Sequence, residues 1–227
     1  MCRPGSASLG RVFSQVHTHL SGLRDMARIS SILLFFPLAL SGQSITPASK
    51  AVPALTEAQQ IASAVLPLPK EFRGDARVLG YRTAGTKLSE LRAGKGDFTC
   101  LASNPSAPQF HVACYHKSME PFMARGRELR DQGVKGDQVD SVRFKEVRSG
   151  KLVMPAHPAA LYQLTGPAGS YDPASNTVAA DVKPLFVVYI PGATSASTGL
   201  SAQPVEGGPW IMFPGTPKAH IMLVPKM

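Results

Sequence analysis

The stretch from Asp97 to Gly133 restricts the folds open to this chain more than any other part of it. The residues from Gln109 to Lys117 follow a polar loop and are predicted to form a strand, on which successive side chains point to opposite faces. The residues after it predict a helix, because their apolar side chains recur at the spacing of one helix face. That stripe consists of Met119, Phe122, Met123, Gly126 and Leu129. We expect Ser118 to cap the helix and Gly133 to end it, and the apolar stripe then needs a sheet to cover it.

The remaining chain predicts short strands and few helices. A first helix is expected to begin at Thr56, which can form a capping box with Gln59. Another helix is expected over 137–148, with a strand at Val142-Arg143-Phe144 as the alternative. Tight turns join the first three predicted strands, which favours an antiparallel meander. The predicted strands are 76–83, 87–92, 98–102, 109–117, 160–165, 185–190, 210–213 and 220–224.

Two features of the last third refine this pattern. Residues 185–190 are continuously apolar, as expected of a central strand covered on both faces. Residues 166–177 and 192–204 are rich in small, polar and turn-forming side chains and are predicted to be loops. The predicted fold class is therefore α+β, a mostly antiparallel sheet with two or three helices packed on it and one disulfide, in a single domain over 55–227.

The N-terminal region has the parts of a secretory signal peptide. After Met26 come a short basic start, an apolar core over 32–40 and a small-residue exit. The core is shorter than the roughly 20 residues of a spanning helix, so we expect cleavage between Ser41 and Ser44 and no membrane anchor afterwards. Residues 1–25 do not fit in front of a signal peptide, which indicates a true start at Met26. An Arg- and Ser-rich transit peptide is the alternative.

The signal peptide and its extension, over 1–44, lead into a Pro-, Ala-, Ser- and Thr-rich segment at 45–54, which is predicted to be a flexible tether. The predicted location of the protein is therefore secreted or periplasmic.

The net charge of +9 raises the question of nucleic-acid binding. Arg3, Arg11, Arg24 and Arg28 lie in the segment expected to be removed, together with one acid, Asp25. The mature part then has 24 − 4 = 20 basic and 15 − 1 = 14 acidic side chains, a charge of +6. These charges are dispersed, and no basic run carries the aromatic side chains of a stacking platform. We expect no nucleic-acid partner; the predicted partner is an unknown small molecule or protein.

Cys100 and Cys114 are the two cysteines left once the segment containing Cys2 is removed. In an oxidising compartment an even count of two favours a disulfide. Such a bridge closes a short loop and stabilises the fold by about 3 kcal/mol through loop-closure entropy. The alternative is a catalytic thiol with His116 as its base, which needs an accessible thiolate. We predict the disulfide.

The histidines of the mature part, His111, His116, His157 and His220, show no metal-ligand spacing. Strand alternation places His111 and His116 on opposite faces, which argues against a shared metal. We therefore predict no metal site and no cofactor. An alternative hypothesis is that His116 and His220 lie close together and line a ligand pocket. It depends on the position of His116 near Cys114 and of His220 in the predicted closing strand.

Other side chains complete the set of ligand-binding candidates. Ser170 and Asp172 would supply a hydrolase-like constellation if they converged on His220. Trp210, the only tryptophan, is either a core anchor at the start of a strand or a binding platform. The Ser/Thr run over 192–201 lacks the G-x-S-x-G elbow of a nucleophile, so no catalytic residue is assigned.

The methionines pose a separate alternative, because soft thioethers select Cu(I). We interpret them as core packing, since two lie within the helical stripe. The five concerned are Met119, Met123, Met154, Met212 and Met222.

Several short motifs are spread along the chain from Leu91 onward. They are Leu91-Arg92-Ala93-Gly94, Asp97-Phe98-Thr99-Cys100, the second cysteine Cys114, Gly207-Gly208-Pro209 and Ala219-His220-Ile221-Met222-Leu223. In this combination the chain resembles an uncharacterised group of exported bacterial proteins, from Leu91 to the C-terminus. The group often has tryptophan where this chain has Phe98. The resemblance implies a secreted bacterial protein and transfers no activity.

These observations favour an exported protein with a non-enzymatic binding or structural role in the bacterial periplasm or exterior. The alternative is a small secreted hydrolase-like enzyme with His116 or His220 as its base.

Overall fold

The computed structural model describes residues 54–83 and 87–225. The predicted signal peptide, its start at Met26, the tether as far as residue 53 and the turn at 84–86 lie outside the described residues. The helices are α1 (Glu57–Ala64), α2 (Lys70–Arg73), η1 (Lys117–Met119), α3 (Glu120–Asp131), α4 (Asp137–Arg148) and α5 (Ser195–Thr198). The strands are β1 (Arg77–Gly80), β2 (Ser89–Arg92), β3 (Phe98–Leu101), β4 (Gln109–His116), β5 (Ala159–Pro167), β6 (Tyr171–Asp172), β7 (Thr177–Val178), β8 (Lys183–Tyr189), β9 (Trp210–Met212) and β10 (His220–Leu223).

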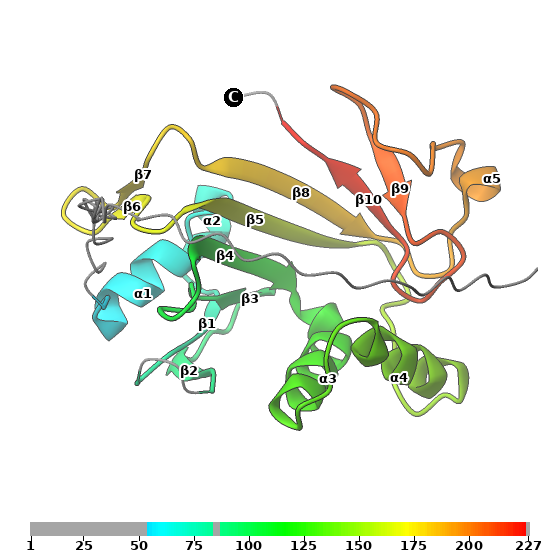
Figure 1. Ribbon diagram of the computed structural model, residues 1–227, viewed down its shortest axis with the longest axis horizontal. Coiled ribbons are helices and arrows are strands. Elements are labelled where there is room, and N and C mark those ends of the chain that lie inside the picture. The colour runs from blue at the N-terminus through cyan, green and yellow to red at the C-terminus, as the bar shows by residue number, and fades with distance from the viewer. Residues whose placement is uncertain (1–53, 84–86, 226–227) are drawn as a thin grey trace, which may run out of the picture. The chain divides into compact units, whose positions relative to one another are not determined.

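Eight strands form one sheet in the order β2-β1-β3-β4-β5-β8-β10-β9, and β6 pairs with β7 in a separate hairpin (Figure 1). Every neighbouring pair in the large sheet is antiparallel except β1 and β3. The predicted α+β class, with a mostly antiparallel sheet, is confirmed. Among the described residues, none of the helices has both the length and the apolar character needed to cross a bilayer.

The predicted meander of the first three strands is wrong, because β3 pairs with β1 in parallel. To reach that position, the chain leaves β2 and crosses close over the start of β1. Gly94 makes the crossing feasible, since a Cβ there would collide with the backbone of Asp75 and Arg77. The Gly96 N–H then donates to the Asp75 carbonyl oxygen at 2.9 Å, which holds the crossing segment in place.

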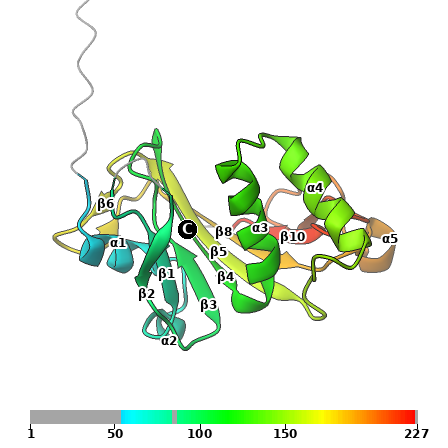
Figure 2. The same cartoon turned by 90° about the horizontal axis from the view of Figure 1, so that it is seen from below.

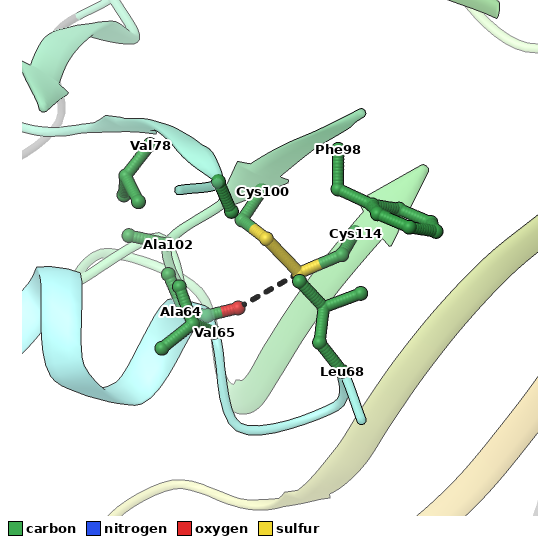
Figure 3. Packing of buried hydrophobic residues seen from close by; sticks show 9 residues of the cluster. Ala64, Val65, Leu68, Val78, Phe98, Cys100, Ala102 and Cys114 are labelled. Carbon is green, nitrogen blue, oxygen red and sulfur yellow. Dashed lines mark hydrogen bonds between the residues drawn. A yellow bond between two sulfur atoms is a disulfide. The ribbon is translucent and has the colours of Figure 1, made fainter. Parts of the chain in front are cut away.

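One face of the sheet carries the disulfide and is covered by α1 and the turn after it. Cys100 and Cys114 lie directly opposite each other on β3 and β4 and form the predicted bridge (Figure 3). Both cysteines are fully buried, and Ala64, Val65 and Leu68 pack on them. The Cys114 sulfur lies 3.1 Å from the Ala64 carbonyl oxygen. This is a sulfur–oxygen contact, because a bridged sulfur has no proton to donate.

The opposite face is covered by α3 and α4, which pack against each other (Figure 2). The predicted apolar stripe of α3 does cover the sheet. Met119 and Phe122 are fully buried against Tyr115, Leu161 and Val187.

The ends of α3 differ in part from the prediction. Ser118 is not the N-cap of a long helix, because a 3₁₀ turn over Lys117–Met119 precedes α3. Instead, the His116 ring nitrogen Nδ1 accepts from the Ser118 N–H at 3.3 Å and contacts its hydroxyl at 2.8 Å. Gly133 has φ +87°, the left-handed conformation that ends a helix without a Cβ penalty. The helix predicted over 137–148 is confirmed as α4.

Three other expectations are corrected. Strand β8 is not covered on both faces, because Phe186 is 37% exposed. Its ring makes a T-shaped contact with the ring of Tyr162. The predicted loop over 166–177 contains β6 and the start of the β6–β7 hairpin. The predicted loop over 192–204 contains α5, whose capping box pairs Thr194 with Ser197.

Candidate functional site

His116 and His220 lie on opposite faces of the sheet. His116 pairs with Phe98 and lies on the disulfide face, where the two rings are 5.9 Å apart. His220 pairs with Tyr189, which pairs with Ala159 on the α3 face. Three strand spacings separate β4 from β10, about 14 Å. The hypothesis that the two histidines line one pocket is therefore wrong.

Ser170 and Asp172 do not converge on His220 either. The Asp172 carboxylate accepts from the Ser175 hydroxyl at 2.6 Å and from the Ala174 N–H at 2.9 Å, so it shapes the hairpin turn. This hairpin packs on the Phe110 end of β4, level with residue 166 of β5. His220 is level with residue 159 of β5, and residues 159 and 166 are about 23 Å apart along that strand. The hydrolase-like constellation is not formed.

Trp210 begins the edge strand β9 and is only half-buried. Its neighbour Ile211 is fully buried and anchors the strand in the core instead. The Ile211 N–H donates to the Ser201 carbonyl oxygen at 2.9 Å, so a loop covers part of this edge. A platform role for Trp210 stays a prediction.

His220 belongs to a buried cluster that sequence reasoning did not foresee. Its Nδ1 lies 2.7 Å from the Lys218 carbonyl oxygen, and a carbonyl only accepts, so Nδ1 carries the proton and Nε2 is the acceptor. The rings of Tyr189 and Phe213 lie 5.1 and 5.7 Å from the imidazole. Burial lowers the pKa of His220, which keeps the imidazole neutral near pH 7. Burial also raises the pKa of Tyr189 to about 12.

The charged part of this cluster ties α4 to the residues before β10. Asp140 accepts from Lys218 Nζ at 2.8 Å and from the Arg143 guanidinium. Arg143 is 4% exposed, donates to the Phe122 carbonyl oxygen at 3.0 Å and lies over the Phe122 ring. Burial acts to raise the pKa of Asp140, but the two cations outweigh it and hold that pKa below its usual value. The arrangement is a structural clamp with one carboxylate between two cations.

Gly126 provides the space for this clamp. A Cβ at Gly126 would lie 2.8 Å from Arg143 Nη1, so the glycine leaves room for the guanidinium between α3 and α4. The sequence pattern included Gly126 in the apolar stripe, and its burial agrees with that. The reason for a glycine at that position is visible only in the packing of the two helices.

The described residues also enclose a cavity of about 320 Å³ beside α1, called here the α1 cavity. Phe110 and Tyr171 contribute aromatic rings to its wall, nearly parallel and 6.2 Å apart. Its polar lining includes the amides of Gln60, Asn104 and Gln109. These residues come from α1, β4, β6 and the loop between β3 and β4. No local motif links them, so sequence analysis missed the cavity.

Gln60 fixes one side of the α1 cavity. Its Nε2 donates to the carbonyl oxygens of Leu55 and Tyr81 at 3.2 and 2.8 Å, and its Oε1 accepts from the Tyr81 N–H at 2.9 Å. These bonds replace strand pairing, which explains why β1 stops at Gly80 rather than at the predicted residue 83. Arg82 at the rim is already held by Glu57 at 2.8 Å.

Within residues 54–83 and 87–225, no three His, Cys, Asp or Glu side chains are grouped closely enough to hold a metal ion. Among the methionines of the copper alternative, Met119 is fully buried, and Met123, Met154 and Met222 pack against the same apolar cluster. This packing supports the interpretation of these methionines as core residues.

Comparison of the chain with known protein families, with curated proteins and with solved structures found no match in any of the three. The resemblance to exported bacterial proteins therefore stays a prediction. In the fold, two of its motif residues have structural roles: Gly94 permits the crossing described above, and Arg92 donates to the carbonyl oxygens of Ala76 and Arg73 at 2.8 and 2.7 Å.

Proposed function

We propose that this protein is an exported, non-enzymatic binding protein that takes a small uncharged molecule in the α1 cavity. The observation that carries the proposal is the lining of that cavity, which joins a stacked aromatic pair to three side-chain amides. A volume of about 320 Å³ falls at the small end of the range for ligand pockets.

The chemistry of the lining favours a ligand with one flat apolar face and a polar edge. Phe110 and Tyr171 offer apolar ring surface. Amides offer donors and acceptors together, and the Gln109 amide, which lines the cavity, has no hydrogen-bond partner within the described residues. The one charged group in the lining, Arg82, is neutralised by Glu57 and also donates to the Glu90 carbonyl oxygen at 2.9 Å. A neutral ligand therefore suits the site better than an anion.

Hydrogen bonds within the chain fix the cavity wall, which reduces the ordering cost of binding. Helix α1 begins with a capping box in which Thr56 and Gln59 satisfy each other's backbone N–H groups. The Gln60 side chain then joins α1 to the end of β1. These bonds hold the helix against the sheet at a fixed position.

Export is supported by two independent observations. The residues from Met26 to Ser44 follow the pattern of a signal peptide. The Cys100–Cys114 bridge is the second, because structural disulfides persist in oxidising compartments. Sequencing the N-terminus of the mature protein tests the export proposal: a first residue from 42 to 44 is expected, and a terminus upstream of Met26 would contradict it.

Ligand binding is tested by screening neutral mono- and disaccharides, N-acetylated sugars and nucleosides by NMR chemical-shift perturbation. We expect a hit to shift the signals of Gln60, Gln109 and Tyr171. Ala168→Trp fills the cavity mouth from an exposed position and should abolish binding. Ala174→Trp, on the exposed turn of the nearby β6–β7 hairpin and outside the cavity lining, is the matched control. Binding that survives Ala168→Trp unchanged would refute this site.

A further inference from the structure

We propose a second binding site, independent of the α1 cavity, that takes a medium-chain carboxylate. The site is a cavity of about 340 Å³ between α4 and the two loops at 190–193 and 214–217, called here the α4 cavity. In this proposal the apolar chain of the ligand fills the cavity, and its carboxylate pairs with Arg148 at the mouth.

The walls of the α4 cavity are apolar and come from three parts of the chain. Helix α4 contributes Phe144 and Val147, Met154 follows the helix, and Pro191 and Pro217 close the other side. A flexible thioether such as that of Met154 adapts to irregular apolar ligands. The walls therefore match a hydrocarbon chain.

Two backbone hydrogen bonds hold the two loops together. The Gly192 N–H donates to the Thr216 carbonyl oxygen at 2.9 Å, and the Gly215 N–H donates to the Ala193 carbonyl oxygen at 2.7 Å. Both glycines have positive φ, which gives each loop a conformation that other residues rarely adopt. The cavity mouth is thus a formed feature of the fold.

Arg148 supplies the charge selectivity. It is the last residue of α4, it is exposed, and it lines the cavity. Every other arginine in residues 54–83 and 87–225 donates to an acceptor of the chain, whereas Arg148 has no such partner there. A helix C-terminus favours a cation, which accounts for a basic residue at this position. It does not account for an unpaired arginine in the lining of an apolar cavity.

The nearest acid of α4 does not neutralise this arginine. Glu146 is bound by Arg125 through hydrogen bonds of 2.8, 2.9 and 3.2 Å on another side of the helix. Lys145 and Lys151 add further positive charge close by in the sequence, and both are exposed. An apolar cavity with an unpaired guanidinium and an excess of positive charge is complementary to an amphipathic anion. The cavity volume limits the chain to a medium length.

The test uses the mature secreted protein and three ten-carbon probes below their micelle concentrations: decanoate, decanol and decyltrimethylammonium. Binding is followed by NMR, through the signals of Val147 and Met154. We expect decanoate to bind most tightly and the cationic probe least. Arg148→Gln should weaken decanoate binding about fivefold, the upper range for an exposed ion pair, and leave decanol unchanged.

Matched variants make each outcome decisive. Lys145→Gln removes one charge from an exposed position of the same helix, outside the cavity lining, and should leave decanoate binding unchanged. Val147→Phe fills the cavity and should abolish binding of both decanoate and decanol, with thermal unfolding as the check that the variant folds. Equal affinity for decanoate and decanol, or equal effects of Arg148→Gln and Lys145→Gln, would overturn the proposal.

The α1 cavity variant separates this proposal from the proposed function. Ala168→Trp should leave decanoate affinity unchanged, because that residue lines the other cavity. Loss of decanoate binding in Ala168→Trp would place the probe in the α1 cavity and refute the α4 site.

Discussion

Replacing both Cys100 and Cys114 with alanine removes the only cross-link between described residues and tests how much of the fold depends on it. The two cysteines are 14 positions apart, and closing a loop of that length stabilises the folded state by about 3 kcal/mol through the entropy of the unfolded chain. Both side chains are fully buried beneath α1, so the lost sulfur atoms add a small packing loss. For a domain of this size, about 3 kcal/mol lowers the melting temperature by about 6–12 °C.

The assay is urea unfolding of three samples: oxidised wild type, wild type equilibrated with reductant through the unfolded state, and the Cys100→Ala/Cys114→Ala double variant. Reduced wild type keeps the side-chain volumes, so its decrease in the free energy of unfolding measures the cross-link alone. In the double variant, the loss of packing adds to this decrease. The urea m-value should rise in both uncross-linked samples, because their unfolded chains expose more surface. A decrease in the free energy of unfolding of reduced wild type below about 1 kcal/mol, with an unchanged m-value, would refute the argument from loop closure.

Three further perturbations test other parts of the fold. Burial lowers the pKa of His220 in the folded state. The contribution of His220 to the free energy of unfolding is therefore complete above its unfolded pKa near 6.5, and it falls as the pH drops toward the folded pKa. The urea midpoints at pH 7 and pH 5 should differ less for His220→Gln than for wild type. Gly94→Ala should destabilise by at least about 2 kcal/mol in urea unfolding, because its Cβ collides with backbone. Gly74→Ala, which has open space and φ −63°, should instead be neutral or stabilising by up to about 1 kcal/mol. Asp140→Asn leaves Arg143 and Lys218 without their shared anion and should cost about 3 kcal/mol in the same assay, whereas the exposed Asp137→Asn should change stability by less than about 0.5 kcal/mol.

The outcome of the Asp140→Asn experiment also bears on the His220 cluster. Lys218 contributes the carbonyl oxygen that orients the imidazole and the ammonium that binds Asp140. If the clamp positions His220, the NMR titration of His220 should change in Asp140→Asn and stay unchanged in Asp137→Asn. An identical His220 titration in both variants would show that the backbone alone sets its environment.

Local patterns predicted much of the fold. The stretch over 109–117 was predicted as a strand and is β4, apolar spacing identified α3, and the capping box at Thr56 and Gln59 identified the start of α1. Cysteine count and position predicted the Cys100–Cys114 bridge. Each of these signals depends on residues close together in the chain, where strand and helix periodicity leave a direct trace.

The candidate site could not be predicted in the same way. His116 and His220 appeared comparable as isolated histidines, but the pairing register places them on opposite faces and the strand order separates their strands. The parallel pairing of β1 with β3 depends on a backbone crossing at Gly94, which no periodicity reveals. The two cavities join side chains from segments that are far apart in the sequence.

The sequence by itself thus determined the strand–helix unit between Asp97 and Gly133, because the local spacing of apolar residues determines which strand face and which helix face are buried. Only the tertiary structure decided which functional groups meet: the clamp of Asp140 with Arg143 and Lys218 beside His220, and the amide-lined cavity beside α1. The physical reason is that strand order and helix packing set those distances, and neither follows from the properties of a single segment.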